Sequence, residues 1–132
     1  MSIVKYINIE SLGDHRGELI SLESKENIPF DIKRVYYLFA NKRNIDRGHH
    51  AHKKLKQVIF CIKGSCKINF DNSHSTQTIL LSNYKRGVYV DSVIWRKMFD
   101  FSDDCILMVL ADANYDEEDY IRSYDEFIEY MK

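Results

Sequence analysis

Short hydrophobic segments, rich in β-branched and aromatic residues, follow one another along most of the chain. Stretches such as Lys63-Gly64-Ser65 and Asp71-Asn72-Ser73 separate them. Because β-branched and aromatic residues favour strands, while Gly, Asn, Asp and Ser favour turns, this pattern predicts a succession of strands. The predicted strands are 32–39, 56–62, 66–70, 76–81, 87–91, 94–99 and 105–111.

The spacing of these segments indicates an all-β fold. Several short strands joined by short turns are typical of an antiparallel sandwich or barrel. The sequence contains no internal repeat, low-complexity tract or linker, and its single proline is Pro29. We therefore expect one domain that spans residues 1–132.

Near the C-terminus the apolar residues follow the spacing of a helix rather than that of a strand. Ser123-Tyr124-Asp125-Glu126 has the spacing of a capping box, in which Ser123 is the N-cap residue. Apolar residues then recur at the spacing of a helix, which predicts a helix of about two turns. We expect this helix to dock on the strands rather than to bind a partner. Its apolar residues are Tyr124, Phe127, Ile128 and Met131.

Composition narrows the class of protein. The chain has 132 residues, of which 45% are hydrophobic and 13% aromatic, so it can fill a core and is not disordered. Its formal net charge of -1 gives no general attraction to nucleic acids or anionic membranes. Residues 33–67 are nevertheless rich in Lys, Arg and His, whereas 112–129 are mostly acidic. The basic zone suits a small anionic ligand or a solvated surface equally well.

The cysteines and the absence of targeting signals in the sequence indicate in which cellular compartment the protein is expected. Cys61, Cys66 and Cys105 are odd in number, form no C-x-x-C pair and lie in apolar runs. They are therefore expected to be reduced, buried thiols. The sequence shows no signal peptide and no apolar run of the roughly 20 residues that span a bilayer. We expect a soluble cytoplasmic protein.

Candidate chemistry gathers around two histidines. Residues two apart on a strand point to the same face, so His50 and His52 would share one side of the sheet. The same alternation places Arg34 with Tyr36, and groups Gln57 with Ile59 and Cys61 on one face of the next strand. If these faces line one barrel interior, their polar groups need partners or a ligand.

The residue types leave three interpretations of the histidines open. Two histidines are too few for a usual catalytic metal site, and Gln57 is a weak substitute for an acidic ligand. The histidines could also be hydrogen-bonded core residues. Alternatively, they could be acid–base groups, because a neutral imidazole accepts a proton and Tyr36 can donate one.

This stretch resembles the histidine motif of the cupin superfamily. That motif reads His-x-His, four residues, an acidic ligand, six residues and Gly. Here it reads His50-Ala51-His52, then Gln57, then Gly64, with the usual spacing. Gln57 takes the position of the acidic ligand, and Asn44 stands where the motif usually opens with glycine.

The whole chain resembles the nucleotide-sugar 3,4-ketoisomerases, which act on dTDP-4-keto-6-deoxyglucose. Two of the similar blocks read Arg-Gly-His-His-Ala-His-Lys-Lys-Leu at 47–55 and Tyr-Asp-Glu-Glu-Asp-Tyr-Ile-Arg at 115–122. The resemblance implies a cupin fold, a double-stranded β-helix or jelly-roll barrel with a short C-terminal helix, that needs neither metal nor cofactor. It also implies a homodimer with exchanged N-terminal strands, here residues 3–9. The other similar blocks are 28–37, Gln57-Val58, 93–95, 98–101 and Tyr124-Asp125.

The resemblance also implies roles for individual residues. His50 would be the base at the sugar, with His52 and Tyr36 moving protons on its oxygens. Arg34 and Arg47 would hold the substrate and its diphosphate. Gln57 would orient a histidine. Trp95, Tyr115 and Tyr120 could stack on thymine, but core packing is the simpler expectation for each.

Two further arginines bear on the product. Within the resembling family, the residues aligned with positions 16 and 96 accompany either the glucose or the galactose configuration at C4. Arg16 matches the galactose type and Arg96 the glucose type, so this chain combines one residue of each type. We expect the glucose configuration, for 3-amino-3,6-dideoxy sugars of surface glycans. The alternatives are a 3,5-epimerase and a non-catalytic cupin that binds a sugar nucleotide.

Overall fold

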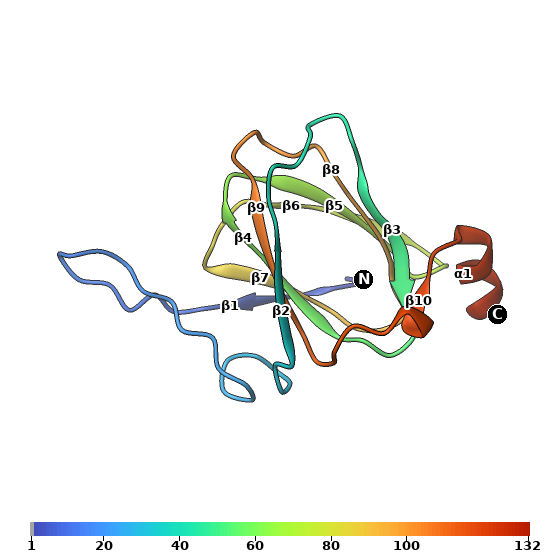
Figure 1. Ribbon diagram of the computed structural model, residues 1–132, viewed down its shortest axis with the longest axis horizontal. Helices are drawn as coiled ribbons and strands as arrows, with labels where there is room; N and C mark the ends of the chain where they lie inside the picture. Colours follow the sequence, from blue (N-terminus) through green and yellow to red (C-terminus); the bar gives the residue numbers. More distant parts are fainter. Residues whose placement is uncertain (1) are drawn as a thin grey trace.

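The computed structural model describes residues 2–132, which form two five-stranded antiparallel sheets that face each other (Figure 1). The expected all-β class is therefore confirmed. The first sheet has the order β1 (Lys5–Asn8), β7 (Arg86–Val90), β4 (Gln57–Lys63), β9 (Ile106–Ala111) and β2 (Arg34–Leu38). The second has the order β10 (Tyr120–Ile121), β3 (Arg47–His52), β8 (Trp95–Phe99), β5 (Cys66–Asp71) and β6 (Thr76–Leu81).

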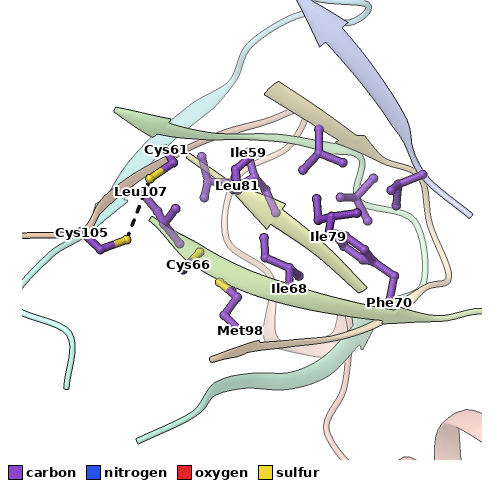
Figure 2. Close-up of a cluster of buried hydrophobic side chains, with 14 of the residues drawn as sticks. Ile59, Cys61, Cys66, Ile68, Phe70, Ile79, Leu81, Met98, Cys105 and Leu107 are labelled. Atoms are coloured by element: carbon purple, nitrogen blue, oxygen red, sulfur yellow. Dashed lines mark hydrogen bonds between the residues drawn. The ribbon is translucent and has the colours of Figure 1, made fainter. Parts of the chain in front are cut away.

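The main hydrophobic core fills the space between the two sheets (Figure 2). Along β4, Ile59 and Cys61 point into this core, while Val58 and Phe60 belong to a second cluster. This alternation is the one that the period of a strand requires. Gln57 is buried at the start of the same strand, so it continues the inward row of Ile59 and Cys61.

The second cluster lies on the outer face of the first sheet. Ile28 and Phe30, from the segment between β1 and β2, pack there against Val58, Phe60 and Leu110. The earlier part of that segment forms an arm that projects from the body, shown in blue at the left of Figure 1. The backbone of the arm folds back on itself through hydrogen bonds from Leu12 N to Leu19 O and from Asp14 N to Gly17 O.

The predicted terminal helix is confirmed as α1 (Tyr124–Tyr130). The Ser123 side chain accepts a hydrogen bond from Glu126 N, as the capping-box spacing predicts. Phe127 is fully buried against Trp95 and Ile121, so the helix docks on the second sheet. Trp95 is therefore a core residue, as expected.

The seven predicted strands are all present with small shifts at their ends. Two elements near the C-terminus were not predicted: β10, which pairs with β3, and the 3₁₀-helix η1 (Glu117–Asp119). Cys61, Cys66 and Cys105 are free and buried, as expected. In residues 2–132 no helix is long and apolar enough to cross a membrane.

The N-terminal strand is present, as its sequence suggested. β1 pairs with β7 of the same chain, with Lys5 opposite Tyr89 and Asn8 opposite Arg86. The expected exchange of this strand between two copies stays a prediction, as does the homodimer itself.

Candidate active site

An irregularity in β3 sets the direction of the histidines. The pairing of β3 with β8 shifts register between Gly48 and His50, where Gly48 has φ +95° and His49 has φ +54°. A Cβ on Gly48 would lie 3.0 Å from the carbonyl oxygen of Arg96, so glycine is required for this close approach. The bulge directs exposed His49 outward and keeps half-buried His50 with buried His52.

The two histidine rings pack against each other and against a tyrosine. The ring centroids of His50 and His52 are 4.9 Å apart, and Tyr120 lies 5.2 Å from His50 and 4.4 Å from His52. Tyr120 belongs to β10, whose pairing places it opposite His52. Tyr120 of the C-terminal segment thus covers one side of the two histidine rings.

An aspartate fixes the orientation of His52. Asp119 Oδ2 lies 3.1 Å from His52 Nδ1, and the same carboxylate accepts hydrogen bonds from the backbone N–H groups of Lys54 and Leu55. The other ring nitrogen of His52, Nε2, is buried and has no hydrogen-bond partner within the described chain. His52 is therefore held at one nitrogen and open at the other.

Both histidines are neutral near pH 7. Burial, and next the positive charge of Arg96, lowers the pKa of His50 to about 4. The same two causes lower the pKa of His52 to about 2, although a carboxylate faces its ring. Neutral imidazoles can accept protons, which is the state a general base requires.

A buried arginine stands beside these histidines. Arg96 is 1% exposed, donates to Gln57 Oε1, and donates from Nη2 to the carbonyl oxygen of Ile94 at 3.1 Å. Its Nε is buried without a partner, and it forms no ion pair with any carboxylate of residues 2–132. Burial lowers the pKa of Arg96 to about 10, which still leaves the guanidinium charged at pH 7. The site therefore contains a buried positive charge that has no direct ion-pair partner among residues 2–132, although the Asp119 carboxylate acts on it from a distance.

Gln57 connects this arginine to Tyr36. Because arginine can only donate, the amide oxygen of Gln57 must face Arg96, and its Nε2 then faces the Tyr36 hydroxyl at 3.0 Å. Burial raises the pKa of Tyr36 above its usual value, so the phenol keeps its proton. Gln57 was expected to orient a histidine, but its hydrogen bonds lead to Arg96 and Tyr36 instead.

A cavity of about 190 Å³ opens beside this cluster. Its lining includes Arg34, His52, Leu55, Asp119 and Tyr120. The Arg34 guanidinium lies 5.3 Å from the centre of the Tyr36 ring and 5.8 Å from that of Tyr115. Tyr115 is 59% exposed, so the expectation that it packs in the core was wrong.

The structure thus gathers most of the predicted site residues, which come from β2, β3, β4 and β8. It does not bring in Arg47 or Arg16. Arg47 is exposed and donates to Asn41 Oδ1 at the far end of β3, and Arg16 forms an exposed ion pair with Asp14 on the projecting arm. The residues that come together are Arg34, Tyr36, His50, His52, Gln57 and Arg96.

Sequence reasoning missed Asp119 as a site residue. It lies 67 positions from His52 in the chain, and only the pairing of β10 with β3 brings the two together. A signal was present in the resemblance, since the similar block 115–122 contains Asp119. Within residues 2–132, no group of three or more His, Cys, Asp or Glu side chains is placed to hold a metal ion.

The described chain is similar to known proteins over nearly its whole length. Residues 2–132 match the model of the FdtA family, described as WxcM-like, C-terminal. The chain belongs to this family. It is 50% identical over 127 residues to the TDP-4-oxo-6-deoxy-α-D-glucose-3,4-oxoisomerase of Aneurinibacillus thermoaerophilus, an alignment that covers 96% of this chain and 91% of that protein.

Solved structures agree with the family assignment. One is a histidine-to-asparagine mutant of the 3,4-ketoisomerase QdtA from Thermoanaerobacterium thermosaccharolyticum in complex with TDP-4-keto-6-deoxyglucose. It is 43% identical, with a TM-score of 0.96 over 99% of this chain and 95% of that one. The TDP-quinovose 3,4-ketoisomerase WlaRB from Campylobacter jejuni is 42% identical, with a TM-score of 0.93 over 98% and 99% of the two chains.

The nearest alternative enzyme class shares the fold at a greater distance. The RmlC epimerase of Mycobacterium tuberculosis is 18% identical, with a TM-score of 0.73 over 89% of this chain and 67% of that one. This likeness concerns the barrel alone.

Proposed function

We propose that this protein is an isomerase, a 3,4-ketoisomerase that converts dTDP-4-keto-6-deoxyglucose to a dTDP-3-keto-6-deoxyhexose. The observation that carries the proposal is the pair of neutral histidines beside a buried, charged arginine that forms no ion pair within the described part of the chain. Its family and its similarity to a 3,4-oxoisomerase and to QdtA support the same reaction. The proposed domain is the whole span of residues 1–132.

The reaction needs a base and groups that handle two oxygens. The carbonyl at C4 acidifies the proton on C3, so a base can remove that proton while O4 gains one, which gives an enediol. The hydroxyl proton on O3 then leaves, C4 gains a proton, and the ketone stands at C3. No electrons are exchanged with an external partner.

His50 is the proposed base, and its low pKa keeps it ready to accept the C3 proton. His52 Nε2 and the Tyr36 hydroxyl would exchange protons with O3 and O4. As negative charge develops on these oxygens, the charge of buried Arg96 would stabilise it, because electrostatic interactions are strong where water is excluded.

Arg34 is the best placed of the proposed diphosphate ligands, since it lines the cavity and its Nε is buried without a partner in the described chain. Arg47 and Arg16 remain proposed ligands, although within this chain they lie away from the cluster. In the proposed homodimer with exchanged N-terminal strands, a second copy could supply the projecting arm.

We further propose the glucose configuration at C4, and a place in the synthesis of 3-amino-3,6-dideoxy sugars of surface glycans in the cytoplasm. Arg96 supports this choice because a charged guanidinium is a poor proton donor near pH 7. Consistent with it, the chain is 42% identical to the TDP-quinovose ketoisomerase and 33% identical to the TDP-fucose-3,4-ketoisomerase WlaRA.

Incubation of the protein with dTDP-4-keto-6-deoxyglucose, followed by NMR of the product, tests the proposal. A ketone at C3 supports it. Inversion at C3 and C5 would instead identify a 3,5-epimerase. Unchanged sugar, together with saturable binding measured by calorimetry, would identify a non-catalytic cupin.

A further inference from the structure

We infer that Asp119 is a positioning residue, which holds His52 in the tautomer with hydrogen on Nδ1 and thereby makes Nε2 a fixed proton acceptor facing the sugar site. The inferred tautomer follows from the contacts of the free protein. Its consequence for catalysis rests on the proposed function.

The first step concerns what Asp119 can offer. A carboxylate only accepts hydrogen bonds, and this one already accepts two from the backbone, from Lys54 N at 2.8 Å and Leu55 N at 3.3 Å. These bonds fix the carboxylate relative to the turn that joins β3 to β4. Asp119 Oδ2 then lies 3.1 Å from His52 Nδ1. A ring nitrogen at this place must carry a hydrogen to bond the carboxylate.

The second step concerns the other side of the ring. Because His52 is neutral near pH 7, it carries a hydrogen on one nitrogen only. If that hydrogen is on Nδ1, then Nε2 presents a lone pair. This atom is buried and without a partner among residues 2–132, in a side chain that is 1% exposed and lines the cavity. A buried acceptor without a partner costs free energy, which a hydroxyl group of the sugar would recover.

The third step compares the two histidines. Neither a hydrogen bond nor an ion pair links the His50 side chain to a carboxylate within the described chain, whereas His52 has Asp119. A ring held by a carboxylate keeps one tautomer and one direction. His52 is therefore suited to a hydroxyl group at a fixed place. His50, whose ring bonds the backbone of Gly48 rather than a carboxylate, is then the histidine that takes and returns the carbon-bound proton. Asp119 would thus give different roles to two histidines that occupy equivalent positions in the sequence motif.

The test is a long-range ¹H–¹⁵N correlation spectrum of the full chain labelled at histidine, recorded near pH 7 without substrate. His52→Asn identifies the His52 signals among the five histidines. In the native protein, Nδ1 should be protonated and Nε2 not. A native His52 protonated at Nε2 overturns the inference, whatever reaction the protein catalyses.

Asp119→Ala should then release the tautomer, so that Nε2 becomes at least partly protonated. Asp112→Ala is the matched control, because Asp112 also lines the cavity and its Oδ1 accepts a backbone hydrogen bond, from Lys56 N at 3.0 Å, but it forms no hydrogen bond or ion pair with a histidine of residues 2–132. The control should leave the His52 tautomer as in the native protein. If Asp119→Ala also leaves it unchanged, Asp119 does not set the tautomer and the inference fails.

If Asp119→Ala does not fold, Asp119→Asn replaces it. Hydrogen bonds to a charged acceptor are stronger than those to an amide, so the Nδ1–H proton should move upfield or the tautomers should mix. An unchanged proton resonance would overturn the inference. With substrate, the folded variant should lose at least about 10-fold in kcat with KM within a few fold, whereas a merely structural role would raise KM and leave the tautomer alone.

Discussion

Gln57 Nε2 donates a hydrogen bond to the Tyr36 hydroxyl at 3.0 Å, so the phenol accepts this bond and keeps its own proton for another partner. The direction of the bond is set on the far side of the amide, where Arg96 can only donate. In a cupin motif this position usually holds an acidic ligand. Here the position holds a neutral amide. Its oxygen accepts a hydrogen bond from buried Arg96, and its nitrogen donates one to Tyr36.

We predict that Gln57→Glu lowers kcat by about 10-fold or more, since a carboxylate would accept the Tyr36 proton instead of leaving it free. Steady-state kinetics with dTDP-4-keto-6-deoxyglucose would measure the loss. Tyr36→Phe supplies the control: if Gln57 acts through Tyr36, adding Gln57→Glu to Tyr36→Phe should cost little more. Additive losses would show that Gln57 acts by another route.

We also predict that the activity needs no metal. The ligand set in the described chain is His50 and His52 without an acidic third member, because Gln57 is engaged by Arg96 and Tyr36. Elemental analysis and assays after extensive chelation would check this. Stoichiometric metal, with activity that disappears on chelation and returns with the ion, would contradict it.

His50→Asn should reduce kcat by about 10²–10⁴-fold, which corresponds to roughly 3–5 kcal/mol of barrier, while substrate affinity stays within a few fold. The reason is that His50 is the half-buried, neutral imidazole without a carboxylate partner in the described chain. Stopped-flow or steady-state rates, with affinity from calorimetry, would separate the two effects. Normal turnover by this variant would move the base to His52 or Tyr36.

The fold could be predicted from the sequence because each strand carries its own period. Ile59 and Cys61 alternate with Val58 and Phe60, and the structure buries the two pairs on opposite faces. Such local patterns need no knowledge of the rest of the chain. The cap at Ser123 is equally local and was predicted for the same reason.

The site was predictable only as far as its residues share a strand pattern. His50 and His52 could be grouped by alternation, but the contact of His52 with Asp119 depends on the pairing of β10 with β3, which no local pattern encodes. The bulge at Gly48 is likewise set by the close approach of the Arg96 backbone. Arg47 shows the converse: its neighbours in sequence are site residues, but it lies at the other end of the strand.

The pH dependence should reflect the depressed pKa of His50. The base must be neutral, so kcat/KM should persist below pH 6.5 and fall as the pH drops through about 4. A fall centred near pH 6.5 would contradict the buried environment. Unfolding must be measured in parallel, because the unfolded state protonates histidines near pH 6.5 and the folded state does not. The free energy of unfolding should therefore decrease as the pH falls below about 6.5.

The configuration of the product at C4 depends on which face of the enediol receives the proton. Arg96 is fully buried and charged, so delivery from its side is disfavoured, and we predict the glucose configuration. Coupling constants and nuclear Overhauser contacts of H4 in the isolated product would decide, since an axial H4 marks the glucose form. Arg96→His would place a possible donor on that side and should increase the share of the galactose form. An equatorial H4 from the native protein would contradict the prediction and shift the control of configuration to Arg16, in which case Arg96→His should leave the product unchanged.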